Sequence, residues 1–173
     1  MPKLSLRPHL DTRSPVEAIA VDVTCDASGL LRLGYEITGA INRVAIPQPE
    51  PASRTDALWK HTCFEAFLGA DAGYYEFNLS PSSQWAAYRF DGYRAGMRNA
   101  DIPEPRIMWR AKGGTGRLAA TIQLPVDVSG TFGLSAVIEG MDGARSFWAL
   151  AHPSAQPDFH HPACFTAQLP PAS

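Results

Sequence analysis

The stretch LWKHTCFEAFLGADAGYYEFNLSPSSQWAAYRFDGY, residues 58–93, decides the fold of this chain. It contains three runs in which apolar side chains alternate with other side chains. Turn-forming residues at 70–73 and 80–83 separate the runs. Because successive side chains of a strand point to opposite faces, this alternation predicts three consecutive β-strands. Each predicted strand has one apolar face and one face that mixes aromatic with polar residues.

The apolar faces are expected to form the core. They comprise Thr62, Phe64, Ala66 and Leu68, then Tyr75, Phe77 and Leu79, then Ala86, Tyr88 and Phe90. The mixed faces comprise Trp59, His61, Cys63, Glu65 and Phe67, then Tyr74, Glu76 and Asn78, then Trp85, Ala87, Arg89 and Asp91. If the three strands are adjacent in one sheet, the mixed faces form a single surface.

The same alternation continues on both sides of this stretch. It recurs at 16–25, 30–38, 41–46, 106–111, 118–124, 132–139, 145–152 and 164–169, whereas 47–57 and 94–105 have the composition of loops. No window of eleven or more residues has a persuasive apolar period of 3.6. The pattern predicts one all-β domain over residues 1–173, with 1–14 as a loose lead-in. Its fold would be an antiparallel β-sandwich, jelly-roll or immunoglobulin-like, of about 9–11 strands with few or no helices.

Composition narrows the class of partner. The chain has 173 residues and a net charge of -2, and no Lys/Arg cluster suited to phosphates, so no nucleic-acid partner is expected. No apolar run approaches the ~20 residues of a membrane span, and the N-terminus has no signal-peptide pattern. We therefore expect a cytoplasmic protein without a membrane partner. Its three cysteines, Cys25, Cys63 and Cys164, are expected to be reduced and buried.

The mixed face is the candidate ligand site. Aromatic rings stack on the apolar faces of sugar rings, and Glu, Asn, His and Arg supply directional hydrogen bonds. The candidate residues on this face are Trp59, His61, Glu65, Glu76, Asn78, Trp85 and Arg89. A purely structural alternative is that Glu76 and Arg89 form a cross-strand ion pair and the tryptophans cap the end of the sandwich.

Histidines provide a second candidate cluster. His152, His160 and His161 flank the loop PSAQPDF (153–159), and His160 and His161 would point to opposite faces if this segment is extended. His152, Asp158 and His160 could line the rim of the same pocket. Imidazoles and carboxylates also bind metals, but no HxH or HxxxH pair occurs, so we predict no metal. A divalent metal, or haem held by Met97 or Met108 with a histidine, is left open. We predict no cofactor.

Catalytic signatures are weak. The chain has no nucleophile elbow, HExxH, P-loop or dinucleotide-binding fingerprint. Glu65 and Glu76 on neighbouring strands could act as paired acids. A non-catalytic binding domain is therefore expected. The alternatives are a metal-assisted or carboxylate-based enzyme acting on a small polar substrate, and a haem-binding or protein-interaction domain.

Four segments resemble the DOMON-like proteins of bacteria, which are related to the family 9 carbohydrate-binding modules. They are LWKHTCFEAFLG (58–69), YYEFNLSPSSQWAAYRFDGYR (74–94), FWALAHP (147–153) and PDFHHPACF (157–165), within a likeness over about residues 16–169. The resemblance implies a β-sandwich that binds sugars or haem. It implies that Trp59 and Trp85 clamp a sugar, with Glu65, Glu76, Asn78 and Arg89 as hydrogen-bonding partners. The predicted ligand is a carbohydrate or sugar derivative, and the oligomeric state is left open.

Overall fold

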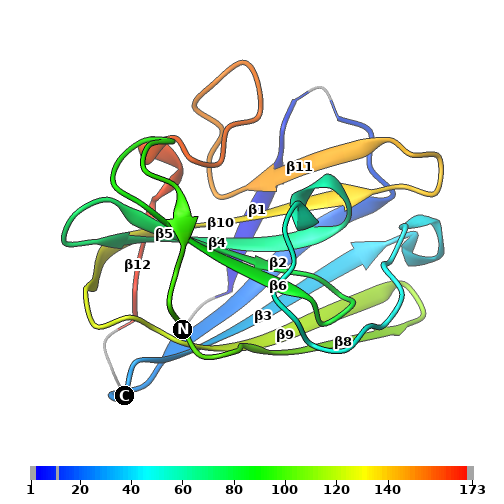
Figure 1. Cartoon of the computed structure of the whole chain (residues 1–173). Coiled ribbons are helices and arrows are strands. Elements are labelled where there is room, and N and C mark those ends of the chain that lie inside the picture. The colour runs from blue at the N-terminus through cyan, green and yellow to red at the C-terminus, as the bar shows by residue number, and fades with distance from the viewer. Residues whose placement is uncertain (1–2, 11, 171–173) are drawn as a thin grey trace.

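The computed structural model describes residues 3–10 and 12–170 of the chain. Two β-sheets pack face to face (Figure 1). The first, called the β3 sheet, has the order β1-β2-β3-β9-β8. Its strands are β1 (Leu4–Pro8), β2 (Val16–Cys25), β3 (Leu30–Gly39), β9 (Thr115–Gln123) and β8 (Arg106–Lys112).

The second sheet, called the β4 sheet, has the order β7-β6-β5-β4-β10-β11, and β12 also pairs with β10. Its strands are β7 (Arg98–Asn99), β6 (Trp85–Phe90), β5 (Tyr74–Leu79), β4 (Cys63–Ala70), β10 (Val128–Glu139), β11 (Arg145–Ala149) and β12 (Ala167–Gln168). Strand β1 joins the sheets, since its first residues pair with β2 while Arg7 and Pro8 pair with β11. All named strand pairs are antiparallel.

The main core lies between the two sheets. Alternate residues of β2, β3 and β9 face alternate residues of β4, β5 and β10, and this region contains the fully buried Phe64, Phe77 and Tyr35. The Tyr35 hydroxyl donates a 2.6 Å hydrogen bond to the Glu65 backbone carbonyl, so even the buried polar tip of this ring is satisfied by the opposite sheet. This confirms the predicted all-β sandwich. Within the described residues, the helices are three single 3-10 turns, Ile41–Arg43, Leu58–Lys60 and Pro162–Cys164.

Several predicted boundaries are wrong. Part of the lead-in, Leu4–Pro8, is strand β1, because its backbone completes both sheets. The predicted strand at 41–46 is a 3-10 turn followed by one isolated bridge at Val44. The Trp59 segment is also a 3-10 turn, and β4 begins only at Cys63. The described chain contains twelve strands, and the two that the sequence did not predict are β1, in the expected lead-in, and the short β7, in the expected loop at 94–105. Strand β12 lies within the strand predicted at 164–169.

The register of β6 is the most consequential error. Glu76 lies opposite Tyr88, and Asn78 lies opposite Ala86. Tyr88 and Phe90 therefore share the outer face with Glu76, whereas Trp85 and Ala87 belong to the main core. The predicted faces of β4 and β5 are right, and the two predicted faces of β6 are exchanged.

Candidate functional site

A cavity of about 440 Å³ lies over the outer face of the β4 sheet. Its floor comes from β4, β5 and β6, and its walls come from loops at 91–97 and 157–160 and from the 3-10 turn at Leu58–Lys60. The lining residues are Trp59, Glu65, Phe67, Glu76, Tyr88, Phe90, Arg94, Met97, Val137, Phe147, Pro157, Phe159 and His160. This volume lies in the range of small-molecule sites.

The outer face of the β4 sheet carries a second, smaller hydrophobic cluster, because several of the alternate residues of β4, β5 and β6 on this face are aromatic. Phe67, Tyr74, Ala86, Tyr88 and Phe90 form a buried cluster separate from the main core. Tyr74 and Phe90 stack with ring centroids 4.7 Å apart and an interplanar angle of 8°. Leu58, Phe159 and Phe165 from the covering segments pack on this cluster. The sheet therefore has two buried faces, and the cavity is the part of the outer one that the loops leave unfilled.

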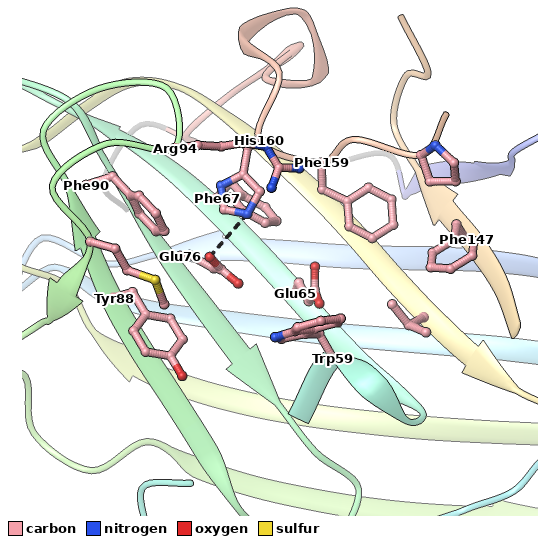
Figure 2. Close-up of a pocket in the computed structure, with 13 residues that line it drawn as sticks. Trp59, Glu65, Phe67, Glu76, Tyr88, Phe90, Arg94, Phe147, Phe159 and His160 are labelled. Atoms are coloured by element: carbon pink, nitrogen blue, oxygen red, sulfur yellow. Dashed lines mark ion pairs between the residues drawn. The ribbon is translucent and has the colours of Figure 1, made fainter. Parts of the chain in front are cut away.

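Two carboxyl groups lie at the floor of the cavity. The side chains of Glu65 and Glu76 are buried, at 2% and 5% residue exposure. Glu65 accepts a 3.1 Å hydrogen bond from the Ser135 hydroxyl, and Glu76 accepts a 3.0 Å bond from the Asn78 amide. Figure 2 shows both carboxyl groups pointing into the space among the aromatic rings. Both donors are neutral, so neither bond supplies a counter-charge.

Burial changes how these acids titrate. Loss of hydration and the nearby Glu76 charge raise the pKa of Glu65 well above its usual range, although the Ser135 hydrogen bond opposes this. Burial also raises the pKa of Glu76 to about 7, against the opposing effects of Asn78 and Arg94. The pair therefore retains a proton near neutral pH. A retained proton lets a carboxyl donate as well as accept a hydrogen bond.

His160 sits above Glu76 as a neutral imidazole. Its Nδ1 lies 2.7 Å from the Tyr74 hydroxyl, and its Nε2 lies 3.6 Å from Glu76 Oε2 (Figure 2). Burial, assisted by the Arg94 charge, lowers the pKa of His160 to about 4. Tyr74 already accepts from the Arg94 backbone N–H, so we assign its hydroxyl proton to His160 Nδ1. The imidazole hydrogen is then on Nε2, facing Glu76.

Asp158 links the two loops that cover the cavity, 91–97 and 157–160, by hydrogen bonds that we call the Asp158 clasp. It accepts hydrogen bonds from the Arg94 guanidinium at 2.8 Å and from the Tyr93 hydroxyl. Burial raises the pKa of Asp158, but these two hydrogen bonds outweigh it and the pKa is lowered overall. Arg94 has a left-handed backbone, φ 53°, which is strained for a residue with a side chain. The clasp therefore holds a strained residue at the cavity wall.

Replacing Asp158 with alanine should make the covering loop at 157–160 more mobile. The variant loses both side-chain bonds across the loops, so backbone amides in residues 157–165 should exchange at least several-fold faster with deuterium. Hydrogen-exchange mass spectrometry would measure this, with exposed Asp101→Ala as the matched control. Unchanged exchange in 157–165 would show that the clasp does not order the loop.

Six predicted site residues belong to this region. Trp59, Glu65, Glu76 and His160 line the cavity. Asn78 supports Glu76 from below, and Asp158 holds Arg94. Their binding roles stay predictions, but the structure does bring them together.

Trp85 and Arg89 do not share this surface, because of the β6 register. Trp85 is in the main core, 5% exposed, with the Arg54 guanidinium 4.3 Å from its ring centroid. Arg89 lies over the Tyr75 ring and pairs with Asp127 at 3.2 Å. A clamp formed by Trp59 and Trp85 is therefore excluded by the fold. The alternative ion pair between Arg89 and Glu76 is wrong for the same reason.

His61 and His152 also lie elsewhere. His61 follows the 3-10 turn, and its exposed ring contacts Glu139 with Nδ1 2.7 Å from Oε2. His152 contacts the Arg7 carbonyl oxygen with Nε2 at 2.7 Å and packs edge-on against His9. Neither lines the cavity, since neighbouring chain segments satisfy both rings.

Sequence reasoning missed several cavity residues. Tyr88 and Phe90 were assigned to the core through the β6 register. Arg94, Phe147 and Phe159 come from segments whose position depends on tertiary packing. For Phe147 and Phe159 the sequence signal is the aromatic content of the segments 147–153 and 157–165, which indicates burial but not the packing partner. The sequence holds no such signal for Arg94.

Three further features of the described residues concern metal binding, membrane spanning and the cysteines. Over residues 3–10 and 12–170, no cluster of three or more His, Cys, Asp or Glu side chains is arranged to hold a metal ion. In the same ranges, no helix has the length and apolar character needed to cross a membrane. All three cysteines are free, and Cys25 is only partly buried, contrary to prediction.

Comparison with solved structures identifies the type of fold. One similar structure is a proposed carbohydrate-binding protein from Bacteroides uniformis, with a TM-score of 0.61 and 15% identity over 94% of this chain and 82% of that one. Another is a family 9 carbohydrate-binding module from Caldicellulosiruptor kristjanssonii in complex with cellotriose, with a TM-score of 0.52 and 14% identity over 86% and 72%. The chain has the β-sandwich fold of a carbohydrate-binding module. No family model and no curated protein matches the sequence, so the DOMON-like relationship stays a prediction.

Proposed function

We propose that this chain binds a small carbohydrate in the cavity above Glu65 and Glu76. The observation that carries the proposal is the combination of aromatic walls and buried carboxyl groups in one cavity of about 440 Å³. Such a volume suits one or two sugar rings. Both structural neighbours support this ligand class, since one is a proposed carbohydrate-binding protein and the other holds cellotriose.

Trp59 is the stacking residue in this proposal. Its side chain lines the cavity and remains 47% exposed, a costly position for an indole that serves only the fold. A sugar that enters would cover this ring with its apolar C–H face. Glu65, Glu76 and His160 then offer donors and acceptors to the hydroxyl groups, and each is already oriented by a partner.

Trp59→Ala tests the proposal. Isothermal titration calorimetry against mono- and disaccharides should find at least one ligand for the wild type, and the variant should bind it at least tenfold more weakly. Met108→Ala is the control, because Met108 is also about half exposed but lies on β8 in the other sheet. Failure of every sugar to bind the wild type, or equal affinity of Trp59→Ala, would overturn the proposal.

A carboxylate-based glycosidase is the second candidate. The observation that favours it is the raised pKa of both carboxyls in a cavity, a common property of catalytic acids. Release of free sugar from aryl glycosides by the wild type, lost in Glu76→Gln, would favour it over simple binding. A stable sugar complex without turnover would exclude it for that ligand.

A further inference from the structure

The cavity has an uncompensated negative charge. Arg94 is the positively charged residue among its lining groups, and Asp158 pairs with it at 2.8 Å. His160 adds no positive charge near neutral pH, because burial lowers its pKa to about 4. Within the described residues, no Lys or Arg forms an ion pair with Glu65 or Glu76. When both acids ionise, the cavity holds two negative charges that the protein itself does not balance.

The placement of the two acids suits one shared cation. Glu65 pairs with Asn78 across β4 and β5, and Phe67 pairs with Glu76, so the two acids are diagonal neighbours on one face. Diagonal side chains of this kind have Cα atoms about 7–8 Å apart, within reach of one small group between them. The bond from Ser135 goes to Glu65 Oε2, and the bond from Asn78 goes to Glu76 Oε1. Each acid thus has a second oxygen that accepts no protein hydrogen bond, although Glu76 Oε2 lies 3.6 Å from His160 Nε2.

The aromatic walls add to this preference. Trp59, Tyr88, Phe90 and Phe159 surround the two carboxyl groups in Figure 2. The faces of aromatic rings carry partial negative charge and attract cations. A primary ammonium group also has three N–H donors, enough to serve two carboxylates at once. Neutral hydroxyl groups would leave the charge of a buried carboxylate pair unbalanced.

We infer that the sugar bound here carries a free amino group, as in a 2-amino-2-deoxy sugar, and that Glu65 and Glu76 together hold its ammonium group. This inference rests on the proposed function and specifies its ligand class. The sugar ring would stack on Trp59 at the mouth of the cavity, with the ammonium directed to the floor.

Proton release gives this inference its own signature. At about pH 6 both acids of the unliganded pair are mostly protonated, because burial raises the pKa of Glu76 to about 7 and that of Glu65 well above its usual range. An ammonium ion favours the ionised pair, so its binding should release at least one proton. The other titratable or charged groups near the pair are His160, Arg94, Asp158, Tyr74 and Tyr88 on the cavity side, and the buried Cys63 and Tyr35 beside Glu65. Neutral sugars would leave the proton in place.

The test compares glucosamine with N-acetylglucosamine and glucose by calorimetry at about pH 6, in two buffers of different ionisation enthalpy. Glucosamine should bind at least tenfold more tightly than N-acetylglucosamine and release at least one proton per ligand. Glu76→Gln should reduce this preference to about threefold or less. Exposed Glu104→Gln is the control and should retain it.

Each outcome separates the inference from the proposed function. Equal or tighter binding of glucose or N-acetylglucosamine would uphold carbohydrate binding and overturn the amino-sugar inference. Absence of binding by all three sugars would overturn the amino-sugar inference, and the proposed function fails with it only if the other mono- and disaccharides also do not bind. Ethanolamine serves as the ammonium probe without a sugar ring; if it alone binds, the site holds an amine and both the proposed function and the amino-sugar inference fail.

Discussion

Glu76→Gln is expected to gain stability relative to the wild type as the pH rises from about 4.5 to about 8. In the folded protein burial raises the pKa of Glu76 from 4.5 to about 7. The folded state therefore binds more protons than the unfolded state between these values, and wild-type stability falls as pH rises through this window. The relative gain of the variant should be about 3 kcal/mol. A glutamine amide keeps the shape and has no charge to bury.

Urea unfolding of both proteins at about pH 4.5, 6 and 8 would measure this difference. His160 has the opposite dependence: its pKa is lowered to about 4, so its contribution to stability rises with pH as the unfolded-state histidine loses its proton. It is present in both proteins, and its effect largely cancels in the comparison. Exposed Glu104→Gln should show no such trend. A difference between wild type and Glu76→Gln that is constant with pH would show that Glu76 is not buried as an acid.

The same buried pair shows what the sequence could predict. Glu65 and Glu76 were placed on one face because β4 and β5 each alternate with a clear apolar side. Their burial was not evident, since a carboxylate opposite a core face normally faces water. The covering residues come from loops, and loop position depends on packing that alternation does not encode.

The register of β6 depends on one residue of loop length. A loop of residues 80–83 would place Trp85 opposite Asn78, on the cavity face. The actual loop extends through Gln84, with Ser83 in a left-handed conformation, φ 80°, and Leu79 lies opposite Trp85. A shift of one residue moves every side chain to the other face. Both faces of the strand WAAYRF carry aromatic rings, Trp85 on one and Tyr88 and Phe90 on the other, so its aromatic residues do not decide between the two registers.

Alternation also fails to predict where the side chains of loop residues near the site point. His160 and His161 are adjacent, and only contact with Tyr74 and the aromatic cluster assigns the first to the cavity. His161 instead caps the 3-10 turn that follows it, accepting from the Ala163 N–H. The segment is a turn that leads into a 3-10 helix and not an extended strand, so the direction of each ring depends on its tertiary partners.

The corrected register changes what is expected of Trp85 and leaves the role proposed for Trp59 unchanged. Trp85→Ala should cost about 3–5 kcal/mol of unfolding free energy, because it removes a large side chain from the main core. Trp59→Ala should cost little stability and weaken ligand binding at least tenfold, since Trp59 is half exposed at the cavity mouth. Urea unfolding together with calorimetric titration of each folded variant would measure both effects.

Trp85→Phe is the matched variant for the core position. Within the described residues, the Trp85 indole N–H is buried without a hydrogen-bond partner. Phenylalanine removes this unsatisfied donor while keeping most of the ring volume and the surface beneath Arg54, so its cost should be well below that of alanine. If Trp85→Ala instead unfolds at the wild-type urea concentration and loses ligand binding, then β6 has the other register, with Trp85 on the cavity face beside Glu76.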